Sequence, residues 1–365
     1  MKHHIYIKGI MLLAAVLLAA CNGSDDVIDL PDGSGSAKAD EIRLNADVWH
    51  VMEGTRATTI NGGTLTSGSF MASSYMENTN TAYINPEQVD YVTDKWVWSN
   101  GKHYWPATEK LDFFAYMPET KPSYISDITY SAPGTPGVPQ AQFTCENLPM
   151  TYDAATPAAG QGSSLQEFVW GITVGQNKAG QGESGVTMKF RHPFARIKFQ
   201  LAANHPNVII NSITFKNLKT GGTCTLNNTD IADTYYYTTS EWTVLTPAEG
   251  GSNLVMTLAS KDADDKWIAA PVNTFNRADE TVPIGGWSTT SSEHEFVNLL
   301  VIPQAFAGAI EVNASWNDWG DSPVEHTVTA TIPSITWRAG YSYTYTFNIT
   351  PEDLVVNLTD FTEQW

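Results

Sequence analysis

The sequence predicts an all-β protein made of two β-sandwich domains in tandem. Aromatic residues, which favour strands, are abundant: the chain has 12 Trp, 15 Tyr and 14 Phe. Short segments of alternating apolar and polar residues recur between Gly, Pro, Asn and Asp, which is typical of sandwiches. A length of 365 residues exceeds one ordinary core. We therefore expect an N-terminal domain over residues 41–203 and a C-terminal domain over residues 204–365.

The composition indicates a folded, acidic protein that does not bind nucleic acid. Hydrophobic residues make up 42% of the chain, which is enough to form a core. The 20 basic and 39 acidic residues give a formal net charge of −19. Binding to phosphate groups needs a cationic surface, and this balance of charge does not provide one.

The first 20 residues are typical of a signal peptide that ends in front of a cysteine. Lys2 and Lys8 supply positive charge, and the apolar run over residues 10–20 is too short to span a bilayer. Cys21 follows Leu-Ala-Ala, an order that resembles the lipobox of bacterial lipoproteins. The resemblance implies cleavage before Cys21 and its lipidation with palmitate, which would hold the chain at a membrane surface. An ordinary secretory signal with a chance cysteine is the alternative.

Residues 21–40 are predicted to form a flexible tether, because they are rich in Gly, Ser and Asp. Residues 22–26 read Asn-Gly-Ser-Asp-Asp and resemble the acidic export tag that sends some bacterial lipoproteins to the outer face of the outer membrane. A plain solvated linker is the alternative. The export tag predicts an outer-membrane lipoprotein precursor at the cell surface.

The first predicted strand follows the tether. Ile42, Leu44, Ala46 and Val48 alternate with polar residues, so one face of this strand is apolar. The residues after the strand are predicted to form an exposed connector that contains one arginine, Arg56.

Further strands follow at short spacing. Residues 91–98 form an aromatic strand that ends at a hairpin-type turn over residues 99–101. Residues 186–190 and 197–201 alternate strictly, but the parity of their apolar positions changes between the two segments. A period of two changes parity only through a bulge or bend, and Pro193 supplies that interruption.

The chain ends in two alternating strands. Residues 341–349 carry aromatic and aliphatic residues at every second position, with Ser, Thr and Asn between them. A last strand begins at residue 354. The apolar positions from there to the end are Leu354, Val356, Leu358, Phe361 and Trp365.

No motif for catalysis, a cofactor or a metal is present, so the sequence predicts a protein that is not an enzyme and that uses no cofactor. Cys145 and Cys224 lack partners at metal-ligand spacing. The sequence leaves open whether they form a disulfide or remain two separate buried thiols. His192, beside Pro193 at a strand end, is interpreted as structural rather than as a base.

A group of aromatic residues has two interpretations, as a platform that stacks against sugars or as core. Trp96 and Trp98 share one strand face, which favours the core. The remaining members of the group are Tyr104 and Trp105.

Several segments together resemble the fimbrillin family, the type V pilins of Bacteroidales bacteria. The most specific are the Asp-Phe-Phe-Ala-Tyr-x-Pro stretch at 112–118 and the Phe-x-His-x-x-Ala-Arg-Ile stretch at 190–197. They occur together with the lipobox cysteine, the alternating first strand and the arginine of the connector. The resemblance covers essentially the whole chain in organisation, and it implies that the two sandwiches are transthyretin-like.

The resemblance also implies a mechanism of assembly. Fimbrillins are exported as lipoproteins, and a trypsin-like protease outside the cell cuts after an arginine in the first connector. In this sequence the cut falls between Arg56 and Ala57, and residues 41–56 are the removable first strand and connector. The displaced strand comprises Ile42, Leu44, Ala46 and Val48. The donor strand from another subunit comprises Leu354, Val356, Leu358, Phe361 and Trp365, and it adds to the open groove by β-strand addition.

We therefore expect a structural subunit of cell-surface fimbriae that mediates adhesion, with other fimbrillin subunits and the protease as partners. Burial of the four apolar side chains of the first strand would contribute roughly 5–9 kcal/mol as an upper bound. A non-polymerising anchor, a tip adhesin and a surface glycan-binding lipoprotein are the alternatives.

Overall fold

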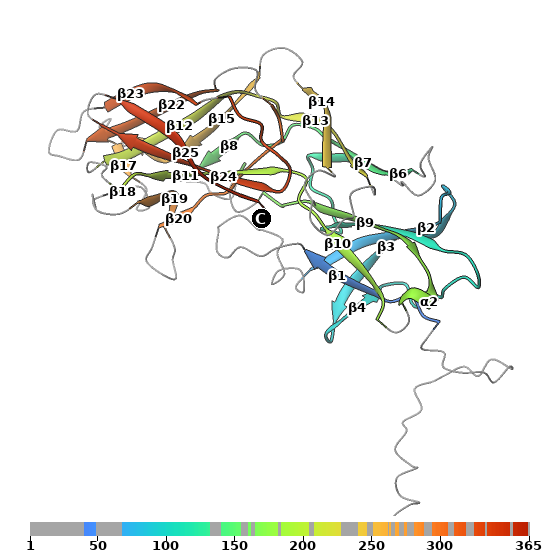
Figure 1. Ribbon diagram of the computed structural model, residues 1–365. Helices are drawn as coiled ribbons and strands as arrows, with labels where there is room; N and C mark the ends of the chain where they lie inside the picture. The colour runs from blue at the N-terminus through green and yellow to red at the C-terminus, as the bar shows by residue number, and fades with distance from the viewer. Residues whose placement is uncertain are drawn as a thin grey trace, which may run out of the picture.

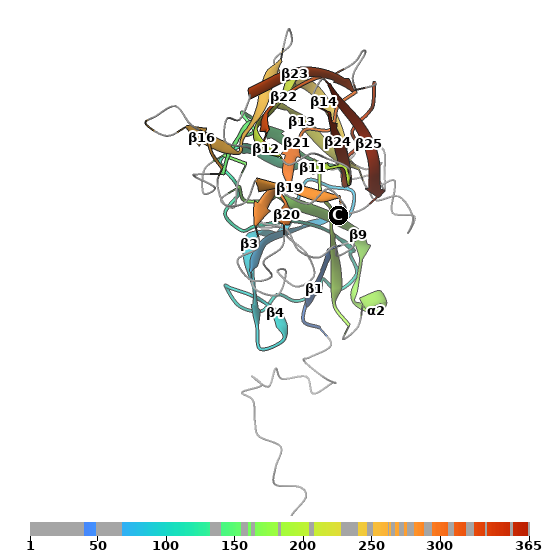
Figure 2. The same cartoon turned by 90° about the vertical axis from the view of Figure 1, so that its left-hand side faces the viewer.

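The computed structural model describes residues 40–48, 68–131, 140–154, 160–161, 165–181, 184–203, 208–227, 240–246, 251–261, 263, 267–269, 274–275, 281–287, 294–305, 310–318, 325–332, 334–350 and 353–363. Their regular secondary structure is β-strand apart from one short helix, α2 (Lys178–Gln181), so the predicted all-β class is confirmed. Figures 1 and 2 show two lobes, one built around the early strands and one around the late strands. In the described part of the chain, no helix has the length and apolar character needed to cross a membrane.

A five-stranded sheet forms the centre of the N-terminal lobe. Its order is β4 (Lys95–Trp98), β3 (Ala82–Val92), β2 (Ser69–Met76), β5 (Leu111–Met117) and β9 (Val169–Gln176). Phe113 of β5 packs in a core on one face of the sheet, and its neighbour Phe114 packs in a second core on the other face. Successive side chains of a strand point to opposite faces, so the Asp-Phe-Phe-Ala-Tyr stretch is nearly all buried because the sheet is covered on both sides.

The first of these two cores lies between the five-stranded sheet and a parallel pair of strands, β1 (Leu44–Val48) and β10 (Val186–Phe190). Leu44 lies opposite Val186, and Val48 lies opposite Phe190. The second core lies under a four-stranded sheet of β14 (Ser240–Thr246), β13 (Gly221–Asn227), β7 (Gln140–Cys145) and β6 (Ile125–Ser131).

The C-terminal lobe contains two larger sheets. The first has the order β20 (His294–Phe296), β19 (Val282–Trp287), β11 (Ala195–Leu201), β24 (Tyr341–Ile349) and β25 (Leu354–Glu363), and β21 (Leu299–Val301) also pairs with β11. The second has the order β23 (Glu325–Ile332), β22 (Ile310–Asp318), β12 (Val208–Leu218), β15 (Ser252–Thr257) and β8 (Thr151–Asp153), and β18 (Thr274–Phe275) also pairs with β12. A separate hairpin joins β16 (Ala259–Lys261) to β17 (Trp267–Ala269).

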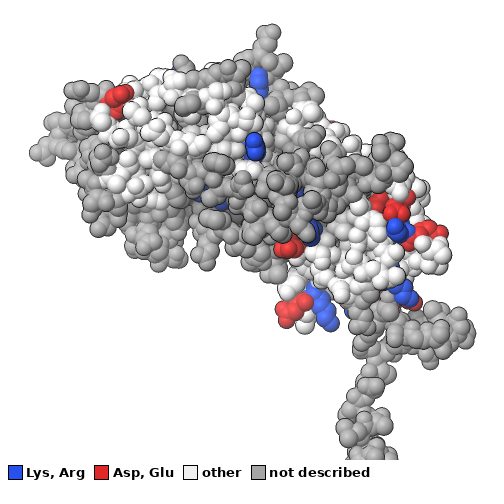
Figure 3. Space-filling model, viewed as in Figure 1, with Lys and Arg blue, Asp and Glu red and all other residues white. Residues whose placement is uncertain are grey.

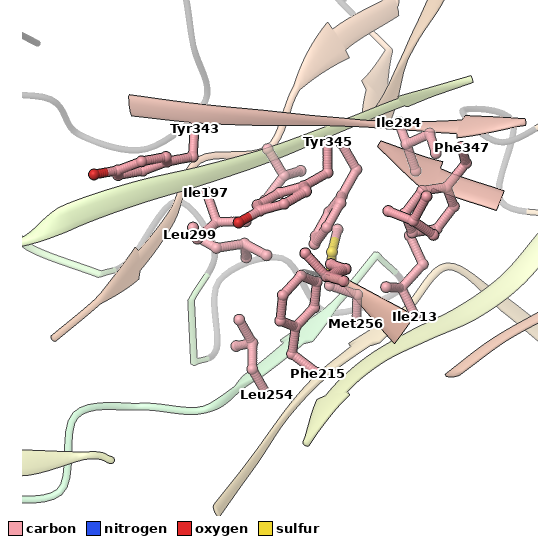
Figure 4. Packing of buried hydrophobic residues seen from close by; sticks show 14 of the residues in the cluster. Ile197, Ile213, Phe215, Leu254, Met256, Ile284, Leu299, Tyr343, Tyr345 and Phe347 are labelled. Atoms are coloured by element: carbon pink, nitrogen blue, oxygen red, sulfur yellow. The ribbon is translucent and has the colours of Figure 1, made fainter. Parts of the chain in front are cut away.

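The core of this lobe lies between the two larger sheets (Figure 4). Ile197, Tyr345 and Phe347 from the first sheet point toward Phe215 and Met256 from the second. The alternation predicted for residues 341–349 is therefore the pattern of a strand whose apolar face lies on this core.

The sheets do not divide between residues 203 and 204, where we expected the domain boundary. Three strands before that point pair with strands after it: β7 with β13, β8 with β15, and β11 with β24. The alternating pattern of a strand identifies its apolar face but carries no information about its partner, and these pairings were not predicted.

The change of parity near Pro193 marks the passage from one lobe to the other. β10 ends at Phe190 beside β1, and β11 begins at Ala195 in the middle of a C-terminal sheet. The backbone between them is fixed on both sides: the indole Nε1 of Trp242 donates to the carbonyl oxygen of Pro193 at 2.7 Å, and the Gly340 N–H donates to that of Phe194 at 2.8 Å.

The aromatic segment 91–98 is two strands and not one. β3 ends at Val92, β4 begins at Lys95, and the two pair in antiparallel fashion. Thr93 and Asp94 both have positive φ, 49° and 62°, which is the conformation of a two-residue type I′ hairpin. The prediction of one continuous strand was wrong because Thr is not among the residues that usually mark this turn.

Candidate functional site

The first strand lies in a groove of the N-terminal lobe. The side chains of Ile42 and Leu44 are 0% and 2% exposed, and Ala46 packs partly buried against the same core. Asn45 and Asp47 are exposed. The predicted alternation therefore corresponds to one face turned into the groove. The core residues that line this part of the lobe include Phe70, Trp98, Trp105, Val186, Met188 and Phe190.

The backbone just before and within β1 is hydrogen-bonded on both sides. On one side the Val186 N–H donates to the carbonyl oxygen of Arg43 at 2.8 Å, where the parallel pairing with β10 begins. On the other side the Ile42 N–H donates to the carbonyl oxygen of His103 at 2.8 Å, and the Trp105 N–H donates to that of Asp40 at 2.9 Å. The segment thus fills the groove, whose two sides are β10 and the loop after β4.

Charged side chains surround the start of the strand, and Figure 3 shows acidic and basic groups side by side on this lobe. The Glu41 carboxylate lies 3.6 Å from Lys102 Nζ and 3.8 Å from the Arg43 guanidinium. Asp40 forms an ion pair with Lys178 of α2. These pairs are partly exposed, so each contributes at most about 1 kcal/mol.

The last strand, β25, lies at the edge of a C-terminal sheet and pairs only with β24 among the described strands. Leu354 and Val356 are buried, Leu358 is partly buried, and Val355 between them is 44% exposed. Figures 1 and 2 place β25 in the lobe that does not contain β1.

A bulge in β25 accounts for the uneven spacing of its apolar residues. Tyr345 lies opposite Leu358 and Thr344 lies opposite Asp360, so Thr359 is the extra residue. Because of the bulge, Phe361 lies opposite Tyr343 just as Leu358 lies opposite Tyr345. The positions of Phe361 and Leu358 therefore share one face of the strand. Nothing is described of the Phe361 side chain itself.

Four of the predicted site residues lie outside the described residues: Cys21, Arg56, Ala57 and Trp365. The side chain of Val48 is likewise not described. The described ends that flank the predicted cut are Val48 of β1 and Gly68, just before β2.

Sequence reasoning missed the residues that hold the strand from the side of β4. The indole Nε1 of Trp98 donates to the carbonyl oxygen of Ile42 at 3.1 Å. The Glu87 carboxylate, 7% exposed, binds the His103 ring nitrogen Nε2 at 2.8 Å and accepts from the Asn100 N–H at 2.7 Å. No spacing motif links these residues, because a hairpin and a loop bring them together.

The Asp of the Asp-Phe-Phe-Ala-Tyr stretch has a structural role. The Asp112 carboxylate is buried and accepts hydrogen bonds from the Gly175 N–H at 2.8 Å, the Asn78 N–H at 3.3 Å and the Tyr130 hydroxyl at 3.1 Å. Burial, with the Asp112 carboxylate as a further cause, raises the pKa of Tyr130. The carboxylate therefore ties together three segments around β5.

The structure supports the structural interpretation of His192. Its Nδ1 lies 2.7 Å from an oxygen of the Glu167 carboxylate, and both side chains are buried. Burial lowers the pKa of the nearby Arg196 to about 10, and the Glu167 charge opposes this shift. Among the described residues, no group of three or more His, Cys, Asp or Glu side chains is arranged to hold a metal ion.

The aromatic group is mostly core. Trp98 and Trp105 are buried, and Trp96 packs partly buried against the same cluster, whereas Tyr104 is 50% exposed. Cys145 and Cys224 are buried and are not joined by a disulfide.

Comparison with known proteins identifies the family. A model of the fimbrillin-like family matches residues 55–365. The chain is similar in structure to a fimbrial protein of Bacteroides vulgatus, with a TM-score of 0.58 and 17% identity over 89% of this chain and 99% of that one. It is also similar to a candidate cell adhesion protein of Bacteroides ovatus, with a TM-score of 0.45 and 17% identity over 89% and 97% of the two chains. No curated protein matches in sequence. The match of the family model extends over most of the chain, which therefore belongs to the fimbrillin-like family.

Proposed function

We propose that the chain is a structural subunit of cell-surface fimbriae, with a role in adhesion and not in catalysis. It would be exported as an outer-membrane lipoprotein through Cys21. A trypsin-like protease would cut it between Arg56 and Ala57, and β1 would then leave its groove. The C-terminal strand of another fimbrillin subunit would fill the groove, and repetition of this step would build the fimbria.

The observation that carries the proposal is the way residues 40–48, the segment that ends in β1, are held. Ile42 and Leu44 are buried, and the carbonyl oxygens of Asp40 and Arg43 accept hydrogen bonds from opposite sides of the groove. A cut in the connector leaves this segment bound to the rest of the protein by noncovalent contacts alone. Burial of Ile42 and Leu44 contributes about 3–6 kcal/mol, which another apolar strand can match.

The last strand has the features of such a replacement. Leu354, Val356 and Leu358 alternate with exposed or polar residues as Ile42, Leu44 and Ala46 do. The strand lies at a sheet edge, so its removal from β24 breaks one row of backbone hydrogen bonds. Main-chain bonds would supply affinity and the alternate side chains specificity, as in other cases of strand addition.

The test is to incubate the lipidated precursor with an arginine-specific protease, to locate the cut by intact mass and to look for filaments by electron microscopy. We expect a single cut after Arg56 followed by filament growth. Resistance at Arg56 without any polymer would contradict the stalk role. It would leave the alternatives of an anchor, a tip adhesin or a surface glycan-binding lipoprotein.

A further inference from the structure

We propose that the Trp98 side chain and the His103 carbonyl group form a two-point clamp on the strand backbone, and that the same clamp grips the C-terminal strand of a second copy once β1 has left. The first part stands on the contacts of this chain alone. The second part rests on the proposed function.

The clamp holds both backbone groups of one residue. The Ile42 N–H donates to the carbonyl oxygen of His103 at 2.8 Å, and the Ile42 carbonyl oxygen accepts from the indole Nε1 of Trp98 at 3.1 Å. Neither partner belongs to β10. Ile42 is therefore the residue at which the segment is bound to the β4 side of the groove by its N–H and its carbonyl group together.

The two halves of the clamp are held by contacts that do not involve the strand. The Glu87 carboxylate, on β3, binds the Asn100 N–H at 2.7 Å and the His103 ring at 2.8 Å. The His103 ring packs edge-on against the Trp98 indole, with centroids 4.9 Å apart and an interplanar angle of 82°. A single buried carboxylate thus binds the Asn100 backbone and the His103 ring, and that ring packs against the indole.

An empty groove is costly because of these groups. Trp98 is only 6% exposed while residues 40–48 fill the groove, so their departure exposes the apolar face of the indole to water and breaks its hydrogen bond to the Ile42 carbonyl oxygen. Any strand that offers a carbonyl oxygen and an N–H at the position of Ile42 removes this cost. The clamp therefore favours exchange of one strand for another over a groove that stays open.

The clamp also limits which strands can enter. The residue that it holds needs an N–H, which excludes proline, and it needs an apolar side chain to replace that of the fully buried Ile42. Residues 353–363 contain no proline and carry apolar residues at 354, 356 and 358. The C-terminal strand of a second copy meets both requirements.

The first test measures hydrogen–deuterium exchange of the backbone amides in the uncut full chain. Trp98→Phe keeps an aromatic ring and removes the N–H donor, and Trp96→Phe is the matched control because Trp96 lies on the same strand and contacts the Phe70 ring. We expect exchange over residues 40–48 to rise about threefold to tenfold in Trp98→Phe, the range for one lost hydrogen bond. Residues 69–76 should not change. An equal rise in both segments, or the same rise in Trp96→Phe, would overturn the clamp on residues 40–48.

The second test uses the processed full chain and a synthetic peptide of residues 353–363. We expect the peptide to dissociate about threefold to tenfold faster from Trp98→Phe than from the wild type or Trp96→Phe. Equal dissociation rates from all three proteins would overturn the clamp on the incoming strand. If the wild-type groove binds no peptide, the proposed strand exchange is wrong, and so is the second part of this proposal. The hydrogen–deuterium exchange measurement still decides whether the clamp holds residues 40–48.

Discussion

Gly185 lies directly against the backbone of Arg43. A Cβ atom at position 185 would lie 2.9 Å from the carbonyl oxygen of Arg43 and 3.0 Å from its Cβ. Gly185 also has a φ of +78°, which a residue with a side chain adopts at a cost. This close approach lets the Val186 N–H reach the Arg43 carbonyl oxygen at 2.8 Å and start the pairing of β1 with β10.

Replacement of Gly185 by Ala should loosen the first strand. The contact with Arg43 must open, and we expect a loss of about 1–3 kcal/mol in the retention of β1 in addition to the backbone strain. The measurement is amide exchange over residues 40–48, together with the rate at which β1 dissociates after the connector is cut.

Gly340→Ala is the matched control. Gly340 has nearly the same φ, +76°, but its added Cβ would meet only the His192 carbonyl oxygen at 3.7 Å, an ordinary contact. Both variants carry the strain of positive φ, and only Gly185→Ala should speed exchange in β1. An equal effect of the two on β1 would show that the contact with Arg43 does not matter.

The proposed cut depends on one arginine. Arg56 and Arg43 are the arginines between Cys21 and residue 190, and Arg43 lies beside β1, where its backbone is hydrogen-bonded. Arg56→Ala should abolish processing by an arginine-specific protease and block polymer formation. Arg43→Lys should leave the cut in place. Mass spectrometry of the digests checks both, and processing of Arg56→Ala within the connector at the wild-type rate would refute this assignment.

Two neighbouring valines lie on opposite faces of β25, one turned inward and one turned outward. Val356 is 5% exposed and Val355 is 44% exposed. Val356→Arg buries an unpaired charge, so the free energy of unfolding of the C-terminal lobe should fall by about 3 kcal/mol or more. Val355→Arg should change it by less than about 0.5 kcal/mol. Urea denaturation measures both variants, and equal losses would contradict the assigned faces.

The same two positions test the donor role with a peptide, which avoids the effect on folding. A peptide of residues 353–363 with Val356→Arg should bind the processed groove at least tenfold more weakly than the wild-type peptide, because a charge then replaces an apolar anchor. The peptide with Val355→Arg should bind nearly as well as the wild type. Equal affinities would mean that Val356 does not face the groove.

The buried thiol of Cys145 makes the free energy of unfolding depend on pH in the alkaline range. Burial raises its pKa to about 12, whereas an unfolded cysteine has a pKa of about 8.5. The stabilisation is fully present below about pH 8.5, and the free energy of unfolding falls by about 1.4 kcal/mol per pH unit as the pH rises from there toward 12. Urea denaturation at pH 7.5 and 9.5 should show this loss, and Cys145→Ala should remove this part of the slope.

Thiol reactivity offers a second check of the same group. A thiol held in the protonated form is a poor nucleophile, so iodoacetamide at pH 7.5 should modify Cys145 only after the protein is unfolded in urea. Modification of the folded protein at the rate of an exposed thiol would contradict the burial.

Alternation in the sequence predicted which side chains join the apolar cores but not which strands lie together. Ile42, Leu44, Val356 and the apolar row of β24 lie inward as their spacing indicates. The parallel pairing of β1 with β10, some 140 residues away, has no local signature. The pairing of β7 with β13 across the expected boundary has none either.

The part of the site on β4 could not be predicted for a related reason. The sequence suggested that Trp98 is a core residue, which its burial supports. Its second role depends on where its one polar atom points. The indole lies on the hairpin made by the Thr93-Asp94 turn and packs against the His103 ring, which the buried Glu87 carboxylate binds. Both are unusual local choices whose effect appears only when the hairpin and the loop after it are folded.

The most direct test of strand exchange is a cryo-electron microscopy reconstruction of the filament formed after protease treatment, at a resolution that identifies side chains. The account predicts that the strand beside Val186–Phe190 is made of residues 353–363 from a neighbouring subunit and that residues 40–48 are absent. A filament in which residues 40–48 still occupy that position would contradict it.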